Sequence, residues 1–190
     1  MKGVITAGNK HTAEAGAEVL KAGGNAFDAA IAAGWMSFVA ECTLTSAGGG
    51  GFLTGFSEKG QRLSLDFFVQ TPKSKELPQQ NGEKLNFYPV ELDYGGSSQT
   101  FHAGLASVAT PGCVAGLFHI HKTFGTIPMR ELVQPAVELA KNGMKVDAFF
   151  AKIIQLVGPC VSSLPTGKKL FKSSGEFPKI GDFWKMAKFA

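Results

Sequence analysis

Hydroxyl side chains are the first residues of this 190-residue chain that could perform nucleophilic chemistry. Thr43, Thr45 and Ser46 stand just before a run of glycines. None of the three lies in a GxSxG motif or beside a recognisable base, which an activated nucleophile needs. We therefore expect these hydroxyls to hydrogen-bond to the backbone of their own loop. The sequence assigns no catalytic residue.

Histidines and cysteines show no pattern that is typical of a metal site. His119 and His121 are two residues apart in a predicted helix, whereas pairs that bind a metal on a helix are four apart. His11 and His102 are isolated in the sequence. The three cysteines are far apart and lack CxxC spacing, so we expect reduced, semi-buried thiols. We expect no metal and no organic cofactor.

The most distinctive local feature is a run of four glycines, Gly48, Gly49, Gly50 and Gly51. A phosphate-binding loop would be one use of such a run, but no GKS or GKT follows it, and a strand comes next instead of a helix. Residues 52–56 and 62–68 are predicted strands of a hairpin with its turn at 57–60. We expect the glycines to let the backbone approach an edge or a pocket, where side chains would not fit.

Helices are expected to position this hairpin. Residues 12–22 have apolar side chains on one helical face, and residues 26–39 are apolar almost all round, which predicts a central buried helix. Asn25 suits the N-cap of the second helix, and Asp28 suits its first turn.

Three more helices are predicted over residues 111–124, 127–141 and 147–157. Thr110-Pro111 begins the first of them, Pro135 should kink the second, and Gly158-Pro159 should end the third. Residues 70–103 are predicted to be a long irregular connection with one extended piece at 85–90.

The charge is divided unevenly along the chain. Residues 1–159 carry thirteen basic and thirteen acidic residues, so the net charge of +4 lies in the last thirty residues. A basic tail can contact nucleic acid, but a solvated surface is the preferred interpretation, and nucleic-acid binding stays a weaker alternative. Phe171, Phe177, Phe183 and Trp184 are interpreted as anchors for packing onto more protein.

No targeting or membrane segment is expected. Met1-Lys2 leads directly into sequence of a folded type, and the longest apolar run, residues 29–40, is too short to span a bilayer. The compartment is unknown, with the cytoplasm as the default expectation.

Three stretches, in order, resemble the γ-glutamyltranspeptidase family. Residues 20–30 (LKAGGNAFDAA) resemble its GGNA–DAA signature, and residues 47–53 (AGGGGFL) resemble its GGGGF segment. Residues 105–116, with 133–136 and 139–143, resemble its LASxxTPGxVAG…VQPAxxLAxxG block. The resemblance covers essentially the whole chain, and residues 181–188 resemble a further family segment that is cut short.

The resemblance implies part of an αββα Ntn-hydrolase fold. The fold class is then α+β and helix-rich, with one hairpin that belongs to a larger sheet. Residues 1–159 would be a core piece of the large subunit, and residues 160–190 would be a basic segment that continues into missing chain.

The implied activity is acyl transfer or hydrolysis of γ-glutamyl or related amides, such as glutathione. In the family a precursor cleaves itself, and the new N-terminal threonine of the small subunit becomes the nucleophile, whose own free amine can serve as the base. These 190 residues hold no counterpart of that threonine segment, so we expect the chain to be inactive alone. Its expected partners are the remainder of the large subunit and the small subunit, and self-association is a further possibility.

The implied substrate-binding residues are Asp66, Phe68 and Val69. They align with the family's DFRE motif, whose arginine pairs with the α-carboxylate of the substrate. Phe68 stands at the arginine position and offers no donor to a carboxylate. Either the acyl pocket suits glutamate less well, or another cation such as Lys10 or Lys73 supplies the charge. The alternative to an enzyme part is a non-catalytic, truncated binding or interaction module.

Overall fold

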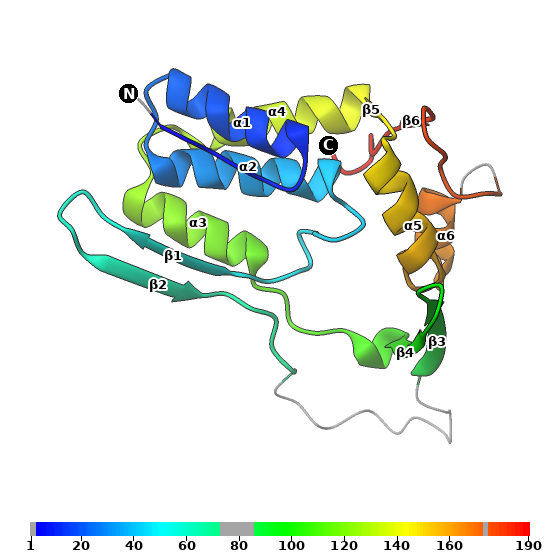
Figure 1. The fold of residues 1–190 in the computed structure, drawn as a ribbon. Helices are drawn as coiled ribbons and strands as arrows, with labels where there is room; N and C mark the ends of the chain where they lie inside the picture. Colours follow the sequence, from blue (N-terminus) through cyan, green and yellow to red (C-terminus); the bar gives the residue numbers. More distant parts are fainter. Residues whose placement is uncertain (1–2, 73–85, 173–174) are drawn as a thin grey trace. The chain divides into compact units, whose positions relative to one another are not determined.

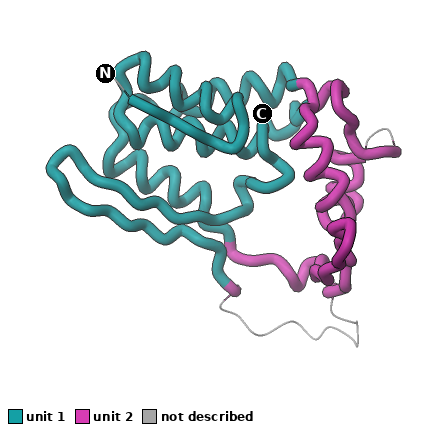
Figure 2. The backbone as a smooth tube through the Cα atoms, in the orientation of Figure 1, with its two compact units in different colours: residues 1–70, 111–144, 185–190 teal, residues 71–110, 145–184 magenta. Residues whose placement is uncertain are grey.

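The structure is a computed structural model that describes residues 3–72, 86–172 and 175–190. It is mixed α+β and rich in helix. The chain forms two compact units: residues 1–70, 111–144 and 185–190 make unit 1, and residues 71–110 and 145–184 make unit 2 (Figure 2). The division at residue 159 that the resemblance implies stays a prediction. Met1, Lys2, Lys73 and Leu85, which the sequence predictions involve, lie outside the described residues.

Four helices build the core of unit 1 (Figure 1): α1 (Lys10–Lys21), α2 (Ala26–Ala40), α3 (Cys113–Phe124) and α4 (Met129–Asn142). Helix α2 contacts the other three, as its apolar surface predicts. The fully buried cluster consists of Ile31, Ala32, Phe38, Leu117, Ile120 and Leu132. Each large aliphatic side chain buried in this way contributes roughly 1.5–3 kcal/mol.

The predicted cap of α2 is confirmed. The side chain of Asn25 accepts hydrogen bonds from the backbone N–H groups of Phe27 and Asp28, and Asp28 accepts one from the N–H of Asn25. This reciprocal capping box satisfies N–H groups that have no partner inside the helix.

The predicted hairpin is present in unit 1. Strands β1 (Phe52–Phe56) and β2 (Arg62–Asp66) are antiparallel, with Phe52 opposite Asp66. Leu53, Leu65 and Phe67 pack against the buried cluster. Within the described residues the two strands pair only with each other, so the larger sheet stays a prediction.

Two predicted helix ends are wrong. Helix α3 begins at Cys113 with Gly112 as its N-cap, two residues later than Thr110-Pro111 predicts, because the first N–H groups find a carbonyl in the glycine run instead of a threonine side chain. Helix α5 (Ala148–Val161) continues through Gly158-Pro159. There the hydroxyl and the N–H of Ser162 both donate to the carbonyl of Gly158, at 2.7 and 2.9 Å, which extends the helix beyond the proline.

The irregular connection predicted over residues 70–103 contains a second hairpin instead. Strands β3 (Tyr88–Asp93) and β4 (Ser98–Ala103) are antiparallel, and Gly95 adopts a φ of 81° in their turn. The sequence pattern does not predict this hairpin, because most of its side chains are exposed and only Leu92 is fully buried. A 3₁₀ turn, η1 (Leu105–Ser107), follows β4.

The C-terminal segment of unit 2 includes a helix that the sequence reading missed, α6 (Pro165–Phe171). The rings of Phe171 and Trp184 stack at 5.3 Å, and both side chains are buried, whereas Phe183 is exposed. The ring of Phe177 also packs within this chain, because Nζ of Lys172 lies 4.1 Å from its centroid. Strands β5 (Met144–Lys145) and β6 (Phe183–Trp184) form a third two-stranded sheet. Across the described ranges, every helix is too short or too polar to cross a bilayer.

Candidate functional site

A cavity of about 480 Å³ lies beside the glycine run in unit 1. Its walls come from α2, the loop with the glycine run, the start of β1, the residues that follow β2, and α3. The described side chains that line it are mostly apolar, the polar ones among them are hydroxyls and a thiol, and none of them is charged. The residues are Ala30, Ile31, Gly34, Ser37, Phe38, Leu44, Thr45, Ser46, Gly49, Gly50, Phe52, Leu53, Phe67, Val69, Cys113, Leu117 and Ile120.

The glycine run approaches other backbone closely, as predicted. A Cβ on Gly50 would lie 2.7 Å from the Cα and carbonyl carbon of Phe68, a distance that real side chains essentially never show. The carbonyl of Gly49 accepts hydrogen bonds of 3.0 Å from the N–H groups of both Gly112 and Cys113. The run therefore joins the end of β2 to the start of α3, and an alanine at Gly50 would force the two backbones apart.

The start of α3 also needs a glycine against the hairpin. A Cβ on Gly116 would lie 2.7 Å from the Cδ2 atom of the Phe67 ring, and one on Gly112 would overlap the Phe67 backbone. These close approaches bring three segments together that are far apart in the sequence: residues 47–53, 65–69 and 110–116.

The three predicted substrate-binding residues lie at this junction. The backbone N–H of Phe68 donates a 2.9 Å hydrogen bond to Oδ1 of Asp66, and Val69 lines the cavity. The ring of Phe68 stacks on that of Phe52, with centroids 5.2 Å apart and planes 13° apart. Phe52 was not among the predicted site residues. Its position at the end of the glycine run, opposite Asp66 in the hairpin register, is the signal that could have identified it.

The hydroxyl of Thr45 bonds to backbone, as expected, but the acceptors belong to the end of α2 and not to its own loop. Oγ1 of Thr45 donates to the backbone carbonyl of Ser37 at 2.7 Å and lies 3.3 Å from that of Glu41. Thr45, Ser46 and Ser37 all line the cavity, and none of the residues around them there is a carboxylate, a histidine or a lysine. The lining therefore supplies no general base to activate a hydroxyl.

The thiol of Cys113 lines the same cavity. All three cysteines are half-buried thiols, as predicted. Burial raises the pKa of the Cys113 thiol, because desolvation disfavours the thiolate. The thiol is thus protonated at neutral pH, and protonated thiols are poor nucleophiles.

In another part of unit 1, hydrogen-bond donors surround Asp28, which is fully buried. Its Oδ1 accepts from the backbone N–H groups of Thr126 at 2.9 Å and Ile127 at 3.3 Å. Its Oδ2 accepts from the hydroxyl of Thr126 at 2.5 Å and from the N–H of Asn25 at 3.0 Å. Burial by itself raises the pKa of Asp28, but the hydrogen bonds from Thr126, Asn25 and Ile127 outweigh it, and the pKa lies below its ordinary value. The sequence predicted the capping role of Asp28 and missed the contacts with residues 126–127.

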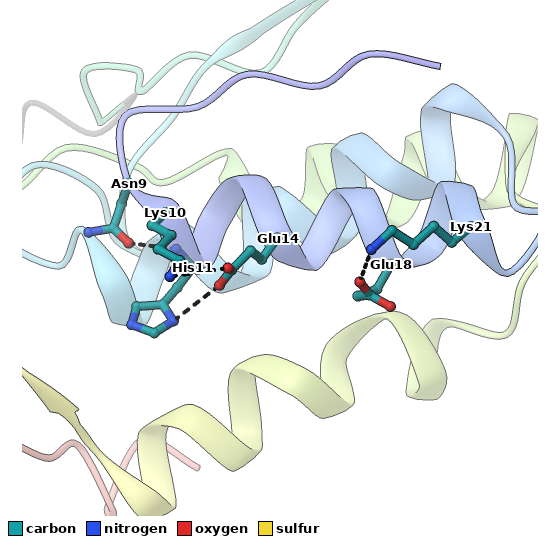
Figure 3. A network of polar contacts seen from close by, with 6 residues as sticks. All are labelled: Asn9, Lys10, His11, Glu14, Glu18 and Lys21. Carbon is teal, nitrogen blue, oxygen red and sulfur yellow. Dashed lines mark hydrogen bonds and ion pairs between the residues drawn. The ribbon is translucent and has the colours of Figure 1, made fainter. Parts of the chain in front are cut away.

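Helix α1 carries an exposed polar network (Figure 3). Nζ of Lys10 and Nδ1 of His11 lie 3.6 and 3.9 Å from the carboxylate of Glu14, and Lys21 pairs with Glu18 at 2.6 Å. Lys10 is 82% exposed in its side chain and does not line the cavity. Such exposed pairs contribute little to stability. In the parts of the chain that the structure describes, no three His, Cys, Asp or Glu side chains group closely enough to hold a metal ion.

Comparison with known proteins shows which family the chain resembles. The sequence model of the gamma-glutamyltranspeptidase family matches residues 12–190. The glutathione hydrolase proenzyme of Escherichia coli is 31% identical over 184 residues, which are 95% of this chain and 30% of that protein. The capsule biosynthesis protein CapD proenzyme of Bacillus anthracis is 32% identical over 178 residues, which are 94% of this chain and 28% of that protein. The chain thus spans about a third of the length of these relatives.

Solved structures agree with the sequence match. The gamma-glutamyltranspeptidase of Helicobacter pylori superposes with a TM-score of 0.81 at 27% identity, covering 99% of this chain and 53% of that one. The cephalosporin acylase of Bacillus halodurans superposes with a TM-score of 0.72 at 26% identity, covering 94% of this chain and 33% of that one. On this evidence, and as its motifs indicated, the chain belongs to the gamma-glutamyltranspeptidase family, whose large-subunit region it matches in part.

Proposed function

We propose that this chain is part of the large subunit of an Ntn hydrolase that transfers or hydrolyses γ-glutamyl or related amides, such as glutathione. The nucleophile is an N-terminal threonine supplied by a small subunit, and the oxyanion donors come from the same subunit. The 190 residues alone are inactive. They occupy one α layer and one hairpin of an αββα fold, and β1 and β2 extend into a larger sheet.

The observation that carries this proposal is the family match over residues 12–190. The fold match to a gamma-glutamyltranspeptidase, of which the chain covers 53%, supports it. The geometry supports it, because two of the three family stretches, residues 47–53 and 110–116, meet the end of β2 at Gly49 and Gly50. The likeness to a cephalosporin acylase supports the inclusion of amides other than γ-glutamyl ones.

We assign Asp66, Phe68 and Val69 to the wall of the acyl pocket. Phe68 replaces the arginine that pairs with the α-carboxylate in the family pattern, and a phenyl ring has no N–H to donate to a carboxylate. Loss of one charge-assisted hydrogen bond costs roughly 1.5–3 kcal/mol, a factor of about ten or more in binding. The pocket is therefore less suited to glutamate than those of relatives that keep the arginine. Lys10 is exposed on α1 and does not line the cavity, and Lys73 lies outside the described residues.

A chromogenic γ-glutamyl anilide tests the proposal. We expect the purified chain to release no chromophore alone, and to release it when mixed with separately produced remaining segments of the E. coli relative. The matched control is the same mixture with the nucleophilic threonine of those segments changed to alanine, which should stay inactive. Release by the chain alone would contradict the proposal, because the nucleophile would then lie within these residues. An inactive mixture in which the chain binds the remaining segments would instead favour a non-catalytic interaction module.

A further inference from the structure

Two exposed aromatic rings stack on each other beside the cavity, and one of them, Phe52, lines it. Phe52 is 66% exposed and Phe68 is 48% exposed, although the two rings stack on each other. Exposed phenyl rings attract flat apolar groups, because stacking adds to the burial of apolar surface. We call Phe52 and Phe68 together the aromatic pair.

Among the described residues, the lining of the cavity beside the aromatic pair carries no charged side chain. Phe52 and Val69 belong to this lining, whose polar side chains are hydroxyls and a thiol. Asp66, the charged residue next to the pair, does not line the cavity, and its Oδ1 accepts from the N–H of Phe68. Bringing a free carboxylate or ammonium into such a lining would leave that charge without a partner, which is costly. A neutral group would meet no such penalty.

The backbone keeps the aromatic pair in place. Gly50 lies against the backbone of Phe68, and the N–H of Phe68 is fixed by the carboxylate of Asp66 at 2.9 Å. The N–H of Phe67 donates to the carbonyl of Gly51 at 3.0 Å. These contacts hold the rings in the stacked arrangement without a ligand, which lowers the entropic cost of binding.

We infer that the aromatic pair and the cavity bind a neutral aromatic acyl group, so that this protein uses arylacyl amides in preference to γ-glutamyl compounds. This inference rests on the proposed function and narrows its substrate class. It concerns a binding site, so its test does not require an active enzyme.

The probe is 2-naphthylacetamide, a neutral arylacyl amide, and the comparison ligand is L-glutamine, an amide with free charges. Saturation-transfer NMR on the 190-residue chain should show saturable binding of the naphthyl protons and no signal from glutamine. Phe68→Leu and Phe52→Leu should each weaken naphthylacetamide binding about tenfold, since each keeps an apolar side chain but removes a stacking face.

Phe56→Leu is the matched control. Phe56 lies in the same strand as Phe52, is 68% exposed, and does not line the cavity. Circular dichroism of each variant checks that the fold is kept. Equal binding by the Phe68→Leu and wild-type chains, or absence of binding to the wild-type chain, would overturn the inference.

The two proposals fail separately. If the chain binds naphthylacetamide but the mixture with the remaining segments releases neither γ-glutamyl nor arylacyl anilide, the binding site stands and the proposed enzyme function falls. If the mixture releases γ-glutamyl anilide faster than naphthylacetyl anilide, the proposed function stands and the substrate inference falls.

Discussion

Asp28 and Asp66 belong to the same compact unit and have opposite surroundings. Asp28 is fully buried and accepts four hydrogen bonds, from Thr126, Ile127 and Asn25. Asp66 is exposed, and its carboxylate accepts one hydrogen bond, from the N–H of Phe68. The region around Asp28 satisfies its polar atoms inside the protein and gives the scaffold its stability. The region around Asp66 leaves aromatic faces in solvent beside an uncharged cavity, which is what a binding site requires.

The largest expected effect is on stability at Asp28. Asp28→Asn replaces an acceptor oxygen by an NH₂ group that faces donors, so buried N–H groups lose their partner. We expect the free energy of unfolding in urea to fall by about 3 kcal/mol or more. Asp66→Asn is the matched control and should cost under about 1 kcal/mol. Equal losses for the two variants would remove the distinction between the two regions.

The next effect concerns the glycine junction. Gly50→Ala places a methyl group 2.7 Å from the backbone of Phe68 and should lower the free energy of unfolding by about 1–3 kcal/mol. Gly48→Ala is the control in the same run, because its Cβ would meet only the Oγ of Ser46 at 3.7 Å. Urea unfolding followed by tryptophan fluorescence compares them. A Gly50→Ala variant as stable as Gly48→Ala would show that the close approach at residue 50 does not hold the junction.

A third prediction concerns substrate choice and uses a chimera in which this chain replaces the matching segment of the E. coli relative. Phe68→Arg should raise the turnover of γ-glutamyl anilide at least about tenfold, since it restores a bidentate donor for a carboxylate. The control, Phe56→Arg, adds the same charge to the same hairpin at a residue that does not line the cavity. If Phe68→Arg brings no gain, residue 68 does not determine the choice of acyl donor.

The smallest effect is the pH dependence from Asp28. Its pKa is lower in the folded protein than the value of about 3.9 in an unfolded chain. The stabilisation is therefore fully present above about pH 4 and is lost as the pH falls through the folded pKa. Between the two pKa values the unfolded state binds one proton more, so stability decreases by about 1.4 kcal/mol per pH unit. Urea midpoints measured from pH 5 to pH 2 should fall less steeply for Asp28→Asn. Parallel curves would mean that Asp28 keeps its ordinary pKa.

The sequence predicted the elements whose signals are local. The capping residues Asn25 and Asp28, the alternating strands of β1 and β2, and the apolar surface of α2 all lie within a few residues of the structure they determine. The close approach at Gly50 was also predictable, because a run of glycines has few other uses. What the sequence did not predict depends on long-range contacts.

The errors have the same origin. The bonds of Asp28 to Thr126 and Ile127 connect residues almost a hundred positions apart. Helix α3 begins at Cys113, later than predicted, because the carbonyl of Gly49, far away in the sequence, accepts its first N–H groups. Phe52 was missed because its role depends on the ring of Phe68 across the hairpin. No pattern within a single element contains these contacts.

The central claim is that this chain provides the large-subunit framework for a threonine nucleophile that another segment supplies. Self-cleavage of the chimera with the E. coli relative tests it most directly, because processing needs the framework and the threonine but no bound substrate. Gel electrophoresis after purification should show the chimera split into two chains, like the unmodified relative, and uncleaved when its nucleophilic threonine is replaced by alanine. A folded chimera that stays uncleaved would contradict the claim.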